Sequence, residues 1–166
     1  MSKENNEIKY FCYGLSIFIL IIVAYSIFKQ VENYQASSDP ILYKLSDKFE
    51  KFFNGDKEKY WTGFLEPLNR RDIMKEINLY KGEKSYTINK EKVHLCLKDE
   101  NGDYYDENLL TYVLAHELAH VICSNIGHTP EWNAIFEQML VELTDEGLYD
   151  PSQGVDPTYC EKGDYS

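Results

Sequence analysis

The sequence predicts an α+β domain that follows an N-terminal transmembrane helix. Three observations support this class: an uncharged apolar run at residues 10–28, apolar residues at helical spacing in several later segments, and two short alternating runs between those segments. A chain of 166 residues provides one compact domain beyond the apolar run. The formal net charge of -11 argues against a nucleic-acid partner, because phosphate binding depends on clustered Lys and Arg.

Residues 10–28 are the predicted transmembrane helix. They contain no charged side chain, and Lys9 and Lys29 bound them. This length meets the lower limit for a helix that crosses a bilayer. A cleaved signal peptide is the alternative, since Ala24 and Ser26 are small residues at the spacing that signal peptidase recognises. Lysines flank the run on both sides, so the positive-inside rule leaves the side of the membrane that holds the domain undecided.

Composition and periodicity divide the chain further. The expected parts are an N-terminal flank at 1–9, the transmembrane helix at 10–28, a polar tether at 29–39, a folded domain at 40–148 and a C-terminal tail at 149–166. Pro40 begins the first helix of the domain and Asn54-Gly55 ends it, with apolar residues every three or four positions between them. A second helix is expected after Pro67, and its predicted buried side consists of Ile73, Met74 and Ile77.

Two short runs, 85–88 and 93–97, predict a β-hairpin with a four-residue loop. In the second run three aliphatic residues alternate with His94 and Cys96. His94 and Cys96 share one face of the strand, but two residues of one strand are too few for a metal site. The residues expected to face the core are Val93, Leu95 and Leu97.

A periodic helix over residues 109–123 carries the residues that point to chemistry. It contains the motif His116-Glu117-Leu118-Ala119-His120, and Asp106 is its expected N-cap. Two histidines four positions apart lie about 40° from each other around a helix, so both imidazoles can bind one ion. Glu117 lies beside that ion, where a carboxylate can take a proton from metal-bound water. The spacing therefore predicts one zinc ion bound by His116 and His120, with Glu117 as the general base.

A catalytic zinc site needs a third protein ligand and an open position. His128 is the best candidate, because Gly127 can end the helix in the left-handed conformation and turn the chain back toward the ion. Thr129 then caps another helix, which fixes His128 at a corner between two helices. Its rivals are Glu142, further along the chain, and Cys123, which we expect to pack as a small buried group.

These residues resemble the signature of the WLM and SprT-like zinc metallopeptidases. The motif at 116–120 is followed by His128 and, four residues later, by the large aromatic Trp132. The segment from Ser85 to Leu143 carries the resemblance and looks most similar to small membrane-anchored members from large DNA viruses. The resemblance implies a minimal zincin fold, with a small antiparallel β-sheet packed on the active-site helix and a substrate strand added at the sheet edge. Relatives of this kind cleave proteins crosslinked to DNA, but a bilayer anchor and an acidic domain depart from that role.

The motif and the resemblance together predict a membrane-anchored zinc endopeptidase that acts on a protein or peptide, in a virion or host membrane if the chain is viral. The alternative is a membrane-anchored binding or assembly protein that retains a structural zinc site without turnover. Tyr112, one turn before His116, is a candidate transition-state donor, and packing is its competing role. Cys160 can pair with Cys96 or Cys123 if the domain lies outside a reducing compartment.

Overall fold

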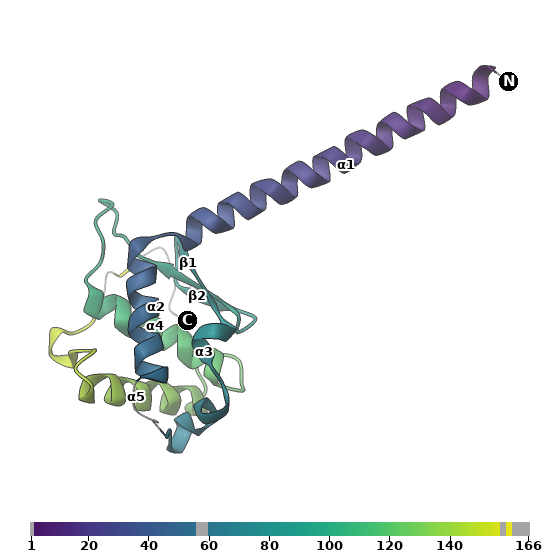
Figure 1. The fold of residues 1–166 in the computed structure, drawn as a ribbon. Coiled ribbons are helices and arrows are strands. Elements are labelled where there is room, and N and C mark those ends of the chain that lie inside the picture. The colour runs from purple at the N-terminus through teal and green to yellow at the C-terminus, as the bar shows by residue number, and fades with distance from the viewer. Residues whose placement is uncertain (1, 56–59, 157–158, 161–166) are drawn as a thin grey trace. The chain divides into compact units, whose positions relative to one another are not determined.

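The structure, a computed structural model, describes residues 2–55, 60–156 and 159–160. The chain divides into two units, Met1–Gln35 and Ala36–Ser166. The first unit belongs to one long helix, and the second contains the remaining helices and all three described strands (Figure 1). Residues 157–158 and 161–166 of the predicted tail lie outside the described part of the chain.

The long helix α1 (Ser2–Ser37) contains the predicted transmembrane segment. Within it, the 18 residues Tyr13–Gln30 have a mean hydropathy of 1.6, and none is buried. At 1.5 Å per residue this stretch extends about 27 Å, close to the ~30 Å hydrocarbon core of a bilayer. The helix is therefore long and apolar enough to span a membrane. It also continues to Ser37, so most of the segment predicted as a polar tether, 29–39, is helical.

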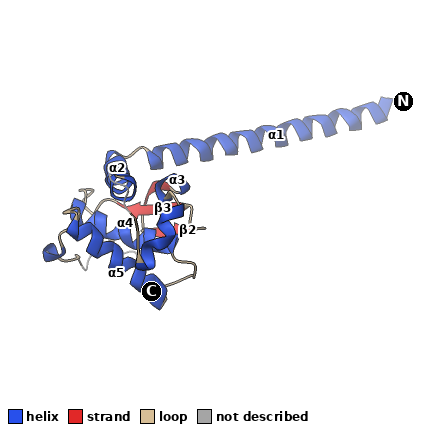
Figure 2. Ribbon diagram, turned by 60° about the horizontal axis from the view of Figure 1, so that its bottom comes forward, coloured by secondary structure: helices blue, strands red, loops and turns tan. Residues whose placement is uncertain are grey.

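The second unit has a small mixed sheet. Its strands are β1 (Asn78–Gly82), β2 (Tyr86–Ile88) and β3 (Lys92–Cys96), in the order β1-β3-β2. β2 pairs antiparallel with β3, but β1 pairs parallel with it, so the prediction of an antiparallel sheet is wrong. β1 has exposed and half-buried side chains without alternation, which left no strand signal in the sequence. The protein is thus a mixed α+β structure with a small three-stranded sheet, shown in red in Figure 2.

The predicted hairpin of β2 and β3 is confirmed, with a tighter turn than expected. Asn89 and Lys90 have φ values of 51° and 58°, and the Glu91 N–H donates to the Ile88 carbonyl at 3.1 Å. Positive φ at both central positions defines a type I′ turn, the form that matches the twist of paired strands. The aliphatic residues of the second run are buried as predicted, with at most 1% exposure: Val93, Leu95 and Leu97.

Three helices follow the predicted periodicity and caps. They are α2 (Pro40–Asn54), α4 (Glu107–Ile122) and α5 (Pro130–Asp145). Asp106 caps α4 by accepting from the Asn108 N–H at 2.7 Å, and Thr129 caps α5 by accepting from the Trp132 N–H at 3.2 Å. α4 packs against β2 and β3, and α5 packs on α4. The helix α4, which carries the motif, therefore contacts the sheet and also contacts α5.

The single helix predicted after Pro67 is wrong. Pro67 instead lies inside a 3-10 helix, η1 (Gly63–Arg70), and a one-turn helix, α3 (Ile73–Glu76), follows separately. Arg71 between them has extended backbone with a φ of -132°, and Ile77 is extended where the chain enters β1. The residues predicted to be buried remain inside or partly inside: Ile73, Ile77 and, half-buried, Met74.

A disulfide joins Cys96 in β3 to Cys160 near the C-terminus, with 6.4 Å between the two Cα atoms. This is one of the two pairings that the sequence allowed; the other partner, Cys123, is free and buried. The neighbouring Tyr159 is only 2% exposed, and its hydroxyl donates to the Cys96 carbonyl at 2.7 Å. The same hydroxyl lies 2.8 Å from the Ser85 hydroxyl at the start of the hairpin. Tyr159 and Cys160 are therefore held to the sheet by a buried side chain and a covalent bond.

Candidate metal centre

The structure brings together the three histidines that the sequence predicted as ligands. His116 and His120 lie one turn apart on α4, and His128 lies in the loop before α5. One ring nitrogen from each lies within 4.8 Å of the others, and the Nε2 atoms of His116 and His128 are 3.2 Å apart. A tetrahedral zinc ion with Zn–N bonds of ~2.0–2.1 Å separates its ligand nitrogens by about 3.3 Å. The three ring nitrogens are therefore close enough together to bind one metal ion.

The loop between α4 and α5 places His128. α4 ends at Ile122, so Gly127 does not end the helix as predicted. Gly127 instead has a φ of 83° within the loop, immediately before His128, and the Thr129 N–H donates to the Gly127 carbonyl at 3.0 Å. The left-handed conformation favours glycine because it has no Cβ. The chain therefore reverses at Gly127 as predicted, but within the loop and not at the end of the helix.

Lys90, which the sequence analysis missed, fastens this loop to the hairpin. Its ammonium group donates to the Cys123 carbonyl and, at 3.0 Å, to the Ser124 carbonyl, where α4 ends. A cation at this end is favourable because the last helix carbonyls lack partners in the helix. Further along the loop, the Glu131 carboxylate accepts from the Ser124 hydroxyl at 3.0 Å and from the Asn125 amide at 2.5 Å. The segment that carries His128 is thus held from β2–β3 and from α5.

Trp132 packs against all three histidine rings. Its ring centroid lies 4.3 Å from that of His128, 4.6 Å from His116 and 5.0 Å from His120. Trp132 is 4% exposed, and its indole N–H is buried without a hydrogen-bond partner in the described part of the chain. Its packing therefore accounts for its position. An apolar wall of this kind fixes ring orientation and limits the access of water to a metal site.

Burial keeps two of the histidines neutral. It lowers the pKa of His116 to about 3, with smaller contributions from the nearby His120 and His128. Burial likewise lowers the pKa of His120 to about 4, aided by His128 and by Lys90. A histidine must be unprotonated to bind a metal ion, so these two rings are ready to do so at neutral pH.

Glu117 lies at the interface between α4 and β2. It is 4% exposed, and the Thr87 hydroxyl on β2 donates to its Oε2 at 2.7 Å. Burial raises the pKa of Glu117 to about 7, although the bond from Thr87 acts in the opposite direction. A carboxyl group with a pKa near neutrality is suited to accept and release a proton at physiological pH. Thr87 lies thirty positions before Glu117, and no sequence motif linked the two.

The remaining candidates from the sequence are Tyr112, Glu142 and Cys123. Tyr112 is half-buried, and its ring lies 5.2 Å from that of Phe136 and 6.0 Å from that of Tyr149. Its role as a transition-state donor stays a prediction. Burial raises its pKa. Within the described residues, the group of metal-binding side chains consists of the three histidines and includes neither Glu142 nor Cys123.

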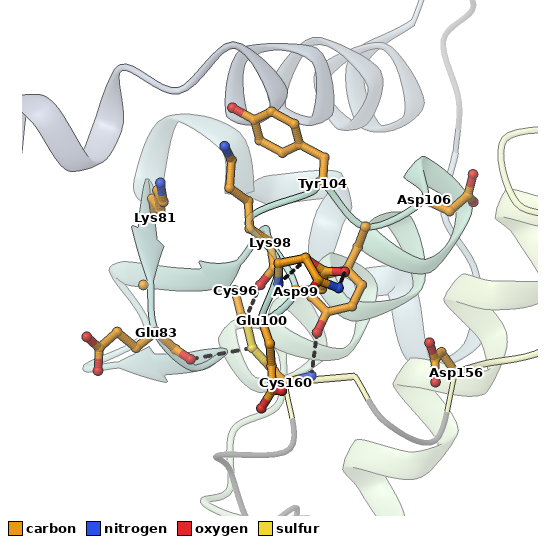
Figure 3. Close-up of a pocket in the computed structure, with 13 residues that line it drawn as sticks. Lys81, Glu83, Cys96, Lys98, Asp99, Glu100, Tyr104, Asp106, Asp156 and Cys160 are labelled. Carbon is orange, nitrogen blue, oxygen red and sulfur yellow. Dashed lines mark hydrogen bonds between the residues drawn. A yellow bond between two sulfur atoms is a disulfide. The ribbon is translucent and has the colours of Figure 1, made fainter.

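A cavity of about 630 Å³ is separate from the histidines (Figure 3). The Cys96–Cys160 disulfide forms part of its wall, and Lys98 lies over the Tyr104 ring, with its nitrogen 4.2 Å from the ring centroid. None of the three histidines, Glu117 or Thr87 lines this cavity. The cavity lies at the end of β3 that carries the disulfide, and the motif residues of α4 do not line it.

Comparison with known proteins shows that the chain is similar to viral proteins. It is 36% identical over 126 residues to protein 042R of Invertebrate iridescent virus 3, an alignment that covers 75% of this chain and 79% of that protein. The chain belongs to the family of protein 042R. Protein 136R of Invertebrate iridescent virus 6 is 47% identical over 105 residues, 61% of this chain and 59% of 136R. Protein R325 of Acanthamoeba polyphaga mimivirus is 33% identical over 103 residues, 58% of this chain and 51% of R325.

The chain thus spans 59% of the length of 136R and 51% of that of R325. All three relatives are described as uncharacterized proteins, so the 042R family supplies no activity. No protein-family model matches the sequence, and no solved structure matches the chain. The histidine cluster and Glu117 are therefore the basis for a proposed function of this chain.

Proposed function

We propose that this protein is a membrane-anchored, zinc-dependent endopeptidase of the zincin type. The observation that carries the proposal is the convergence of His116, His120 and His128, with Glu117 on the same helix. Three protein ligands leave the fourth position of a tetrahedral zinc open, as in catalytic sites, whereas structural sites use four protein ligands. When bound, the zinc ion supplies a Lewis acid and makes water easier to deprotonate near neutral pH.

Each of the remaining roles belongs to a side chain of the protein. The three histidines would hold the ion, and Trp132 packs against their rings as an apolar surface. Glu117 is the general base: its carboxylate accepts a proton from the water that attacks the peptide carbonyl, then passes it to the leaving amine nitrogen. Its burial between α4 and β2 supports this role, because it keeps the carboxyl group in place and its pKa close to neutrality.

The anchor and the charge of the chain limit the substrate. α1 is long and apolar enough to hold the protein in a bilayer, so we infer that the protein or peptide substrate comes within reach of a membrane. Because the relatives are viral proteins, we infer a membrane of the virion or of the infected host cell. The net charge of -11 makes nucleic acid an unfavourable partner.

The test uses the full-length chain in detergent micelles. Bound zinc is measured per chain, and cleavage of an unfolded protein is compared between the wild type and Glu117→Ala. We expect one zinc ion per chain in both proteins, with cleavage by Glu117→Ala reduced to a slow residual rate. Stoichiometric zinc without cleavage by the wild type would favour the structural-zinc alternative, and equal cleavage by both proteins would exclude Glu117 as the base.

A further inference from the structure

We propose that Thr87 is a positioning residue that holds the Glu117 carboxylate in the orientation needed for proton transfer. The inference rests on the endopeptidase function proposed above and adds a residue that the motif does not contain. It starts from a contact between β2 and α4: the Thr87 hydroxyl lies 2.7 Å from Glu117 Oε2 and 3.2 Å from the Glu117 carbonyl oxygen. One hydroxyl thus lies against both the side chain and the backbone of the same residue.

The register of the hairpin directs Thr87 toward α4. Thr87 pairs with Val93, which is fully buried, so the two residues lie on the inner face of the sheet. Its neighbours Tyr86 and Ile88 lie on the other face and are 43% and 40% exposed. A threonine on an inner face brings a hydroxyl group that needs a hydrogen-bond partner. The partner of this hydroxyl is Glu117.

A glutamate needs such a restraint, and threonine can supply it. The Glu117 side chain has three rotatable bonds, and proton transfer requires its carboxylate within hydrogen-bond reach of the reacting water. Threonine is branched at Cβ, so its χ1 angle is stiff and its hydroxyl is well placed. The hydroxyl donates to Oε2, so we assign Oε1 as the oxygen that accepts the proton from water and releases it to the amine.

The hairpin that carries Thr87 is itself anchored at both ends. At its start, the Ser85 hydroxyl accepts from the Cys96 N–H at 3.0 Å and lies 2.8 Å from the hydroxyl of the buried Tyr159. At its turn, Lys90 binds the carbonyls at the end of α4. Thr87 therefore projects from a rigid part of the structure, as a positioning residue must.

Three variants of the full-length chain in micelles test the role. Thr87→Val keeps the shape and removes the hydroxyl, Thr87→Ser keeps the hydroxyl, and Thr87→Ala is a second deletion of the hydroxyl should valine disturb folding. Loss of a residue that supports the functional groups of a metal site typically lowers the activity roughly 10- to 100-fold. We expect that loss in kcat for Thr87→Val and Thr87→Ala, with KM and zinc affinity unchanged. Thr87→Ser is expected to restore kcat to nearly the wild-type value.

Two further readouts separate positioning from a general structural effect. In a Glu117→Ala background, Thr87→Val should cause no additional loss, because a residue that acts through Glu117 has nothing left to orient. In the metal-free chain labelled with ¹³C-glutamate, the side-chain carboxyl resonance of Glu117 should shift in Thr87→Val and stay in place in Thr87→Ser. This resonance reports on the carboxylate without any turnover.

The outcomes distinguish this inference from the proposed function. Cleavage by Thr87→Val at the wild-type kcat, with only residual cleavage by Glu117→Ala, would overturn the role of Thr87 and leave the endopeptidase proposal standing. A wild-type chain that binds zinc without cleaving would overturn the endopeptidase proposal, and an unshifted Glu117 resonance in Thr87→Val would then also overturn the contact. An equal additional loss in the Glu117→Ala background would show that Thr87 acts elsewhere.

Discussion

Removing the Cys96–Cys160 disulfide is expected to lower the free energy of unfolding by about 4 kcal/mol. The bond closes a loop across 64 positions of the sequence. Closing a loop of that size removes conformational entropy from the unfolded chain worth about 4 kcal/mol at 25 °C. Without the disulfide, the hydrogen bonds of the buried Tyr159 hydroxyl to the Cys96 carbonyl and to Ser85 are also weakened. The figure of about 4 kcal/mol is therefore a lower bound for Cys160→Ser.

Urea unfolding followed by tryptophan fluorescence measures this quantity. The two tryptophans of the chain, Trp61 and Trp132, are 3% and 4% exposed and both lie in the second unit, so the signal reports on the folded domain rather than on α1. We expect Cys160→Ser and the reduced wild type to unfold at the same urea concentration, well below that of the oxidised wild type. Cys123→Ala is the control, because it removes the free, buried cysteine of the second unit and should keep the response to reductant. Identical unfolding of the wild type with and without reductant would refute the reasoning.

Two further predictions concern the third ligand and the contact between α2 and α4. His128→Ala should weaken zinc binding by more than about 100-fold in a chelator competition, since it removes a direct ligand, whereas Glu142→Ala should leave the affinity unchanged; the reverse result would exchange their roles. Lys48→Ala should lower the free energy of urea unfolding by about 1–3 kcal/mol, because Lys48 donates to the buried Thr111 hydroxyl and pairs with Glu107 at 2.5 Å. Lys44→Ala, at a more exposed lysine that pairs with the same carboxylate, should cost less than about 1 kcal/mol.

The Lys48 prediction also has a pH dependence with a definite sign. Hydrogen bonds from Lys44 and Lys48 hold the pKa of Glu107 below its usual 4.5. A carboxyl group whose pKa is lowered by folding stabilises the protein above its unfolded pKa, and that stabilisation is lost as the pH falls further. The stability difference between the wild type and Lys48→Ala should therefore be complete above pH 4.5 and shrink below it. A difference that grows in acid would contradict the assignment of Glu107 as the partner.

Local sequence signals predicted the helices α2, α4 and α5 and the grouping of the three histidines. The bounds of α2 followed from Pro40 and Asn54-Gly55, and the cap at Asp106 followed from its position before an apolar periodic run. Each of these signals acts over a few residues, where backbone preferences and side-chain spacing decide the structure. The convergence of the histidines was predictable for the same reason, because helical spacing and one left-handed glycine bring them together.

Features that depend on distant contacts could not be predicted in this way. β1 pairs with β3, although β2 lies between them in the sequence, and the side chains of β1 do not alternate between buried and exposed. Thr87 and Lys90 reach the motif helix only because the hairpin folds onto α4, and neither residue type signals such a role. Cys160 had two acceptable partners until the sheet placed Cys96 beside it. In each case tertiary packing selects among arrangements that the local sequence permits equally.

Zinc X-ray absorption spectroscopy of the full-length, zinc-loaded chain tests the central claim most directly, because it counts the ligands of the ion. We predict three imidazole nitrogens and one further oxygen at ~2.0 Å, the oxygen being that of a water molecule at the position a reacting molecule can take. A sulfur ligand at ~2.3 Å, which would identify Cys123, or four protein ligands around the ion would describe a closed structural site and contradict the account.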